Sequence, residues 1–264
     1  MRRASILALC ALLAASPAPA GGLRAATEAE AGAGVHAVGR IELGSSGYCS
    51  GALVSPTLVL TAAHCVHRPG TAEAYAPDDL RFRAGYRHGQ AVRDRRIRRV
   101  VIHPDYRPDA PNSADKVAAD LALLELAQGI EPHVIRPFAA AGRLGTGDRV
   151  RIVSYAQDRD EYPSYEDGCR VLARDARILA LDCDVTFGAS GAPVFAEGPD
   201  GLRIASVISS GARTDGTVTA FAATVEHGLA RLMQEFGRPS RLSATAKTLR
   251  PGTGDRGTMR FIRP

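Results

Sequence analysis

Three residues have the types and local settings that nucleophilic catalysis by a hydroxyl group requires. Ser190 lies among Gly and Ala in "FGASGAP" (187–193), a composition typical of a tight turn. His64 ends the apolar run in "LTAAHCV", and Asp120 immediately precedes the apolar run "LALLEL". A serine hydroxyl becomes a strong nucleophile when a histidine takes its proton, and a carboxylate can orient that histidine. Each motif alone is more often structural, so the prediction of an acyl-transfer site depends on all three occurring together.

Asp120 is the strongest candidate for the orienting carboxylate. A strand that begins directly after it would carry the carboxylate toward the core, where a charged group needs a partner. The rival carboxylates, none of which begins an apolar run, are Asp115, Asp182 and Asp184. The other histidines, which have no comparable setting, are His36, His67, His88, His103, His133 and His227.

Short β-type runs, broken by Gly, Pro, Ser or Asp, fill most of the chain that must position these residues. They occur on both sides of residues 127–147, where the strand pattern is weakest and where two halves would join. Many short strands of this kind are typical of an all-β sandwich or barrel. One amphipathic helix is predicted at 225–237, where apolar residues follow helical spacing before a Gly and a Pro.

The N-terminus has the pattern of a secretory signal peptide. Two arginines precede a short apolar run, and small residues provide a cleavage site after Ala20. We therefore expect residues 1–20 to be removed and the protein to be secreted or periplasmic. Residues 21–34 are rich in Ala, Gly and Glu and are expected to form a flexible leader. No other apolar stretch reaches membrane-spanning length, so we expect no stable membrane insertion.

Export leaves four cysteines outside the signal peptide, which predicts two disulfides. These residues are Cys49, Cys65, Cys169 and Cys183. Three pairings are open, and the local one, Cys49–Cys65 with Cys169–Cys183, closes two modest loops. The sequence contains no CxxC pair, so we expect no metal site.

Positive charge is concentrated in two segments of this basic chain, whose net charge is +5 and whose pI is about 9.1. These segments are "RDRRIRR" (93–99) and residues 238–264, which we expect to be a disordered basic tail. They are typical of solvated surface, and they would also attract an anionic envelope polymer or acidic protein. The aromatic residues that a nucleic-acid platform interleaves with basic ones are missing, so no nucleic-acid partner is expected.

Taken in chain order, these motifs resemble those of the chymotrypsin/trypsin-like serine peptidases over residues 35–237. "TAAHC", "DLALLEL" and "GASGAP" resemble the family's His, Asp and Ser motifs, the last being "GDSGGP" with two changes, while "CSGALVS" and "HPDY" extend the match. "SYAQDRDEYPSYEDGC" followed by "LDCDVTFGASGAPVF" is most similar to the bacterial branch related to glutamyl endopeptidases. The resemblance implies two antiparallel β-barrels, at about 35–135 and 140–237, with a C-terminal helix.

The resemblance also implies a role for each site residue in hydrolysing a polypeptide substrate. Ser190 would be the nucleophile, His64 the general base and acid, and Asp120 the group that orients His64. The backbone N–H groups of Gly188 and Ser190 would form the oxyanion hole. The strand containing Ser209, Ser210 and Gly211 would pair with the substrate backbone. No cofactor is required for this chemistry.

Ala189 departs from the family pattern in a way that concerns activation. In the digestive branch, the Asp before the nucleophile pairs with a newly formed N-terminus, whereas an alanine cannot pair with an ammonium group. We therefore predict that the oxyanion hole forms without an N-terminal ion pair.

The specificity pocket departs from the family pattern as well. Asp184 falls where trypsin-like enzymes bind basic side chains, but the spacing of Cys183 differs, so Asp184 is alternatively a surface carboxylate. Glutamyl endopeptidases are expected to use a Thr and a His, where this chain has Val185 and Ile208, which argues against strict glutamate preference. Basic, small or apolar, and acidic preferences all remain open.

Two other classes of function compete with a peptidase. One is a catalytically inactive peptidase fold that acts as a binding protein at the cell envelope, and the other is a structural envelope protein. The presence of His64, Asp120 and Ser190 together argues against both, because inactive relatives usually lose one member of the set.

Overall fold

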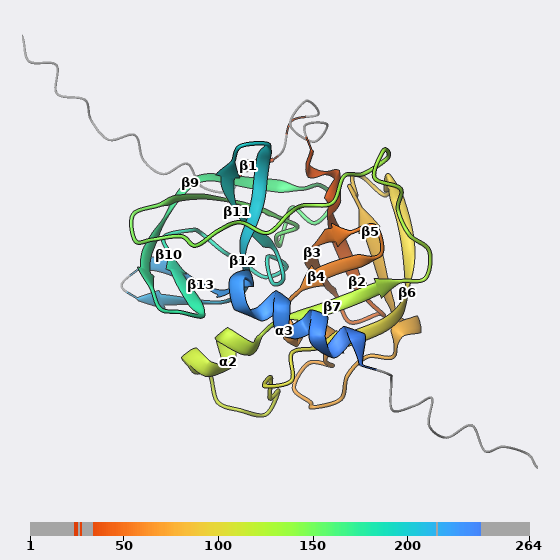
Figure 1. The fold of residues 1–264 in the computed structure, drawn as a ribbon, viewed down its shortest axis with the longest axis horizontal. Coiled ribbons are helices and arrows are strands. Elements are labelled where there is room, and N and C mark those ends of the chain that lie inside the picture. The colour runs from red at the N-terminus through yellow and green to blue at the C-terminus, as the bar shows by residue number, and fades with distance from the viewer. Residues whose placement is uncertain (1–23, 26, 28–33, 215, 239–264) are drawn as a thin grey trace, which may run out of the picture.

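Six antiparallel strands close the first barrel in the order β2-β3-β4-β7-β6-β5 (Figure 1). The computed structural model describes residues 24–25, 27, 34–214 and 216–238. The strands are β2 (Val38–Leu43), β3 (Tyr48–Ser55), β4 (Leu58–Thr61), β5 (Leu80–Ala84), β6 (Arg93–Ile102) and β7 (Ala122–Leu126). The predicted signal peptide, most of the predicted leader and residues 239–264 of the predicted tail lie outside the described residues.

In β5, the alternation of apolar and charged residues determines which side chains face the interior of the barrel and which face solvent. Leu80, Phe82 and Ala84 are buried, whereas the intervening Arg81 and Arg83 point outward. By contrast, β4 and β7 are buried at every position, which explains why their sequences read as continuous apolar runs. These two strands are therefore held within the core, and they support the residues at their ends.

The second barrel has the strand order β9-β10-β13-β12-β11-β8, and it closes because β8 also pairs with β9. The strands are β8 (Arg149–Ser154), β9 (Ser164–Arg174), β10 (Ile178–Leu181), β11 (Pro193–Gly198), β12 (Gly201–Thr214) and β13 (Thr217–Thr224). Residues 127–147, which connect the barrels, contain no strand. The apolar core of the first barrel continues into the second through Tyr155, Phe195 and Val207, so the barrels pack directly together.

Helices and turns cover the ends of the barrels. The 3-10 turns are η1 (Val35–Ala37), η2 (His64–Val66) and η3 (Pro77–Asp79). The C-terminal helix α3 (Val225–Gly237) has the predicted bounds and packs closely at Gly228 against Leu121, the residue before β7, where a Cβ atom would lie 2.2 Å from the leucine side chain. No helix within the described ranges is long and apolar enough to cross a membrane.

The structure confirms the predicted class of two antiparallel barrels with a C-terminal helix. Two elements differ from the sequence-based expectation. Residues of the predicted flexible leader form β1 (Arg24–Ala25), which pairs with β9 at Tyr165 and Ser164. A short helix, α2 (Ala114–Ala119), begins at Ser113, whose side chain accepts a hydrogen bond from the Lys116 backbone.

Candidate active site

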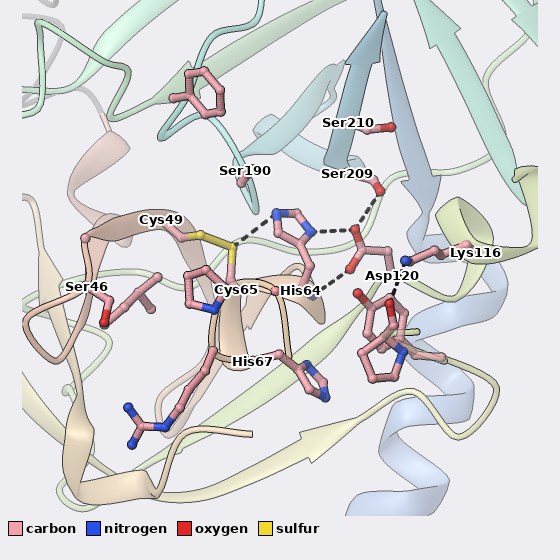
Figure 2. A pocket seen from close by; sticks show the side chains of 18 of the residues that line it. Ser46, Cys49, His64, Cys65, His67, Lys116, Asp120, Ser190, Ser209 and Ser210 are labelled. Carbon is pink, nitrogen blue, oxygen red and sulfur yellow. Dashed lines mark hydrogen bonds and ion pairs between the residues drawn. A yellow bond between two sulfur atoms is a disulfide. The ribbon is translucent and has the colours of Figure 1, made fainter. Parts of the chain in front are cut away.

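A cleft of about 840 Å³ is lined by residues of both barrels. His64 lies in η2, just after β4, and Asp120 follows α2 and precedes β7. The second barrel contributes Ser190, from the loop before β11, and Ser209, from β12. Figure 2 shows these four residues near one another among the side chains that line the cleft. The fold therefore brings together residues that are distant in the sequence.

Asp120 and His64 form a hydrogen-bonded pair. The Nδ1 atom of His64 lies 2.7 Å from Asp120 Oδ2, and the backbone N–H of His64 donates to Asp120 Oδ1 over 2.8 Å. With Asp120 ionised, Nδ1 carries the proton, which leaves the lone pair of Nε2 available as a base. The two contacts fix both the position of the imidazole ring and its tautomer.

A third donor completes the surroundings of the Asp120 carboxylate. The hydroxyl of Ser209 donates to Oδ2 over 2.6 Å, and Asp120 is only 3% exposed. Burial lowers the pKa of His64, but the charge and hydrogen bond of Asp120 outweigh it and raise the pKa above its ordinary value of 6.5. The charge of nearby Lys116 opposes this increase. Asp120 therefore stabilises the imidazolium form that a proton transfer would generate.

Ser190 and His64 line the same cleft, but among the described hydrogen bonds none joins their side chains. The Nε2 atom of His64 instead lies 3.8 Å from Cys65 Sγ (Figure 2). Because Nδ1 carries the proton of a neutral ring, this contact is a van der Waals contact until the ring gains a second proton. Catalytic hydrogen bonds are often long before substrate binds, so the arrangement is compatible with proton transfer.

Residues 187–191 are here termed the nucleophile loop, and the carbonyl groups of its first four residues are held by surrounding backbone and side chains. Phe187 O accepts from Gln157 N, Gly188 O from Ser50 Oγ, Ala189 O from Ala192 N and Ser190 O from Ser50 N. Each trans peptide directs its N–H away from its carbonyl, so these bonds also fix the N–H directions. Within the described part of the chain, the N–H groups of Gly188 and Ser190 have no acceptor, and both residues line the cleft.

The two glycines of the nucleophile loop are required by backbone conformation and by space. Gly188 has φ +85°, and a Cβ atom there would lie 2.4 Å from Tyr155 O. Gly191 has φ +77°, and its Cβ would lie 2.2 Å from Thr61 Oγ1 and 2.3 Å from Ser50 O. Side chains are disfavoured in both conformations, and the close packing of the loop against β3 and β4 leaves no room for a Cβ atom. Both positions therefore require glycine.

The cysteines have the local pairing of the three that the sequence leaves open. Cys49–Cys65 ties β3 to η2 and so braces the turn that carries His64. Cys169–Cys183 ties β9 to the segment that follows β10. In the chain-entropy model, a disulfide that closes a loop of this length stabilises the fold by roughly 3 kcal/mol, because it restricts the unfolded chain. Both groups of residues with metal-ligand geometry, in the described ranges, use these bonded sulfur atoms, which have no thiolate to offer a metal.

The predicted substrate-binding residues are not all in the cleft. Ser209 and Ser210 line it, while Gly211 is an exposed residue farther along β12. Strand β11 pairs with β12 only as far as Val207 at this end, whereas β13 pairs with the other edge of β12 at Ser210 and Gly211. Among the described residues, no strand therefore lies on the β11 side of residues 209–211. The edge therefore has the geometry to accept an additional strand.

Asp184 has an exposed side chain and is not part of the cleft lining. Its backbone N–H donates to the buried carboxyl group of Glu166, with both oxygens at 2.9 Å. The side chain of Val185 packs against Gly211, where an added Cβ would lie 3.0 Å from Val185 Cγ2, and Ile208 is buried in the second barrel. The structure thus favours the surface-carboxylate alternative for Asp184.

Sequence reasoning missed three residues that contribute to the site or its support: Ser50, Lys116 and Glu166. Ser50 was visible only as part of the motif around Cys49, and its link to the nucleophile loop depends on packing between the barrels. Lys116 lies in α2, a helix too short to give a periodic signal. Glu166 occupies an inward position of β9, opposite Ile152, on the same face as Cys169 three residues later. The register shift between these two residues breaks the alternation of the strand, so a strict period of two would have placed Glu166 outward.

Two of the five arginines in residues 93–99 form ion pairs within the protein. Arg98 and Arg99 both pair with the buried Glu125, and Arg99 also lies over the ring of Phe236, with 3.9 Å from Cζ to the ring centre. Asp94 in the same segment pairs with Arg81. These contacts reduce the positive charge that the segment can offer to an anionic surface.

The paired six-stranded barrels and the cleft between them define a chymotrypsin-like β-barrel protein. A solved structure entitled "Structure of Glu endopeptidase in complex with MPD" has the same fold, with a TM-score of 0.67 and 17% sequence identity over 81% of this chain and 95% of that chain. Residues 49–202 match the family model described as a trypsin-like peptidase domain. The chain therefore belongs to the trypsin-like peptidase family.

Characterised relatives share part of this sequence. A modular serine protease of Drosophila melanogaster is 41% identical over 96 residues, which are 34% of this chain and 15% of that protein. Ovochymase of Halocynthia roretzi is 32% identical over 101 residues, 38% of this chain and 6% of that protein. Complement C1r-A subcomponent of Mus musculus is 36% identical over 86 residues, 30% and 12% of the two chains. The matches therefore span a minor part of each relative.

Proposed function

We propose that this protein is a secreted serine endopeptidase that cleaves polypeptides through an acyl-enzyme intermediate. The observation that carries the proposal is the pairing of His64 Nδ1 with the buried Asp120 carboxylate, beside a nucleophile loop that leaves two N–H groups free. Membership of the trypsin-like peptidase family supports the same reaction class. Asp120 would act on the reaction through His64 rather than by taking a proton.

In the first step, Ser190 Oγ would attack the carbonyl carbon of the scissile bond while its proton passes to His64 Nε2. The C–N bond would then break as the imidazolium returns that proton to the leaving amine, which forms the acyl-enzyme. Water would repeat the sequence with His64 as base, releasing the carboxyl product and regenerating the Ser190 hydroxyl. The contact between Ser190 and His64 would form when substrate occupies the cleft.

The N–H groups of Gly188 and Ser190 would stabilise the oxyanion of each tetrahedral intermediate. Removing one such donor typically costs about 3–4 kcal/mol of transition-state stabilisation. The unpaired edge of β12 at residues 209–211 would bind the substrate backbone as an added strand, so that the scissile carbonyl is presented beside Ser190. This arrangement explains why the cleft combines residues of both barrels.

The two disulfides fit the proposed export of the chain, because such bonds persist in oxidising compartments. The signal peptide at residues 1–20 remains a prediction, as does attraction of the basic tail to an anionic surface. Kinship with the glutamyl endopeptidase branch is likewise a proposal, supported by the shared fold and by the sequence resemblance. Val185 and Ile208 argue against strict glutamate preference in this chain.

The second candidate function is an inactive peptidase fold that binds a polypeptide without cleaving it. The contact of His64 Nε2 with Cys65 Sγ rather than with Ser190 favours this alternative. A peptide-library digest analysed by mass spectrometry separates the two functions. An active enzyme should yield products that disappear in Ser190→Ala and fall steeply in Asp120→Asn, a change that costs roughly 10⁴-fold in kcat for a Ser-His-Asp enzyme. Folded wild type that binds peptides but yields no product would contradict the endopeptidase proposal.

A further inference from the structure

Ser50 is a fully buried residue of β3 that joins the first barrel to the nucleophile loop. Its Oγ atom lies 2.9 Å from Tyr155 N and 2.9 Å from Gly188 O, and its backbone N lies 2.8 Å from Ser190 O. One residue of the first barrel thus contacts the carbonyl groups of both residues that carry the free N–H groups.

The direction of the hydroxyl proton follows from these distances. The N–H of Tyr155 can only donate, so Ser50 Oγ accepts that bond with a lone pair. The single hydroxyl proton then has Gly188 O as its acceptor. Because Ser50 is 0% exposed, water does not compete for either bond. The hydroxyl is therefore held in one orientation.

We propose that Ser50 is a positioning residue that holds the nucleophile loop in the conformation required for the oxyanion hole. The peptide between Gly188 and Ala189 is restrained at its carbonyl by Ser50 and at its N–H by Thr186 O, 3.1 Å away. This peptide lies between the two peptides that carry the N–H groups of Gly188 and Ser190, whose carbonyl groups accept from Gln157 N and Ala192 N. Fixing it therefore limits rotation of the peptide on either side and helps to keep both N–H groups directed away from the protein's own acceptors. The inference rests on the proposed peptidase function and adds the device that organises its site.

Among the described hydrogen bonds, this peptide is held by two alone, the one from Ser50 Oγ to its carbonyl and the one from its N–H to Thr186 O. Gly188, at φ +85°, has the conformational freedom to rotate it, and Ala189 is a buried apolar residue with no charge to pair. The hydroxyl of Ser50 supplies a restraint from inside the first barrel. It acts without any contribution from the N-terminus, which agrees with the predicted absence of an N-terminal ion pair.

The test compares Ser50→Ala with Ser154→Ala in the full chain. Ser154 is also fully buried, but its hydroxyl has no hydrogen-bond partner among the described residues, so its substitution removes the same atom without releasing the loop. The measurement is the second-order rate of Ser190 labelling by a fluorophosphonate, with kcat and KM for a cleaved peptide, well below each variant's thermal midpoint. Ser50→Ala should lower labelling and kcat by roughly 10- to 100-fold, somewhat less than loss of an oxyanion donor, with little change in KM.

Two further variants separate positioning from stability. Ser50→Thr keeps the hydroxyl and should restore most of the labelling rate, whereas Ser50→Cys has similar size but a weak donor and should remain slow. A Ser50→Ala protein that labels within about twofold of Ser154→Ala, or a Ser50→Cys protein as fast as wild type, would overturn the proposal. If wild type itself fails to label, the proposed peptidase function fails first, and the role of Ser50 falls with it. If Ser50→Ala does not fold, the comparison of Ser50→Thr with Ser50→Cys decides the question.

Discussion

The buried carboxyl group of Glu166 should make the stability of this protein depend on pH in a specific way. Glu166 is 3% exposed. Burial raises its pKa to about 7 from 4.5, the charges of Asp184 and Asp182 add to the increase, and the hydrogen bond from the Asp184 backbone opposes it. Between pH 4.5 and about 7, Glu166 is therefore protonated in the folded protein, whereas in the unfolded chain it has already lost its proton.

The sign and size of the effect follow from this difference. A folded-state pKa above the unfolded value gives stability that is present at low pH and lost as pH rises from 4.5 to about 7. The loss is about 3 kcal/mol, since each pH unit corresponds to ~1.4 kcal/mol. Glu166→Gln keeps a neutral amide with one acceptor oxygen, so it should resemble wild type at pH 4 and exceed its stability by about 3 kcal/mol at pH 9, or roughly 6–12 °C in Tm for a protein of this size.

Thermal and denaturant unfolding of wild type and Glu166→Gln across pH 4–9 measures this difference directly. Other titrating groups, including His64, are common to both proteins and cancel in the comparison. Glu197→Gln, at a side chain that is 73% exposed, is the matched control and should show no comparable pH-dependent gain. Asp184→Asn should lower the pKa of Glu166 and so reduce the pH dependence. A constant stability difference between wild type and Glu166→Gln across the whole pH range would refute this reasoning.

Three further predictions concern the site. Lys116→Gln removes a charge that lowers the pKa of His64, so the acidic limb of the pH profile of kcat/KM should move to higher pH. Lys116→Arg keeps the charge and should leave the limb in place. An unchanged limb in Lys116→Gln would contradict this role of Lys116. Ser209→Ala removes one of three donors to Asp120 and should lower kcat/KM by roughly 10- to 150-fold in a pH-rate assay, because a hydrogen bond to a charged group contributes about 1.5–3 kcal/mol. Removing residues 21–33 should leave fluorophosphonate labelling within about threefold, as expected when a buried hydroxyl rather than an N-terminal ammonium orders the loop; strict dependence on one new N-terminus would contradict this.

The elements with strong periodic patterns could be predicted from the sequence. The apolar stripe of α3, which ends at Gly237, gave the predicted helix at 225–237. Strand β5 alternates buried and exposed residues, which is the pattern of the short β-type runs from which the all-β class was predicted. Strand β1 contains only two residues, and α2 contains six, which is too few for either period to be visible. The cap at Ser113 was the one local signal for α2.

The candidate site shows the same division between local and spatial information. His64, Asp120 and Ser190 could be selected because each is marked by its own strand or turn. The side chain of Asp184 could not be placed by counting back from Ser190, because the spacing of Cys183 differs from that of the family and the backbone of Asp184 is bonded to the buried Glu166. The contacts of Ser50 with Tyr155 and Gly188 join positions more than 100 residues apart, so they depend on how the barrels pack.

The most direct test of the account is the location and stoichiometry of fluorophosphonate labelling. We predict that wild type, at a pH above the pKa of His64, incorporates one label per chain and that peptide mapping places it on Ser190. Ser190→Ala should incorporate none, and Asp120→Asn should label far more slowly although it remains folded. Folded wild type that stays unlabelled, or a label found on a residue other than Ser190, would contradict the claim that Ser190 is an activated nucleophile.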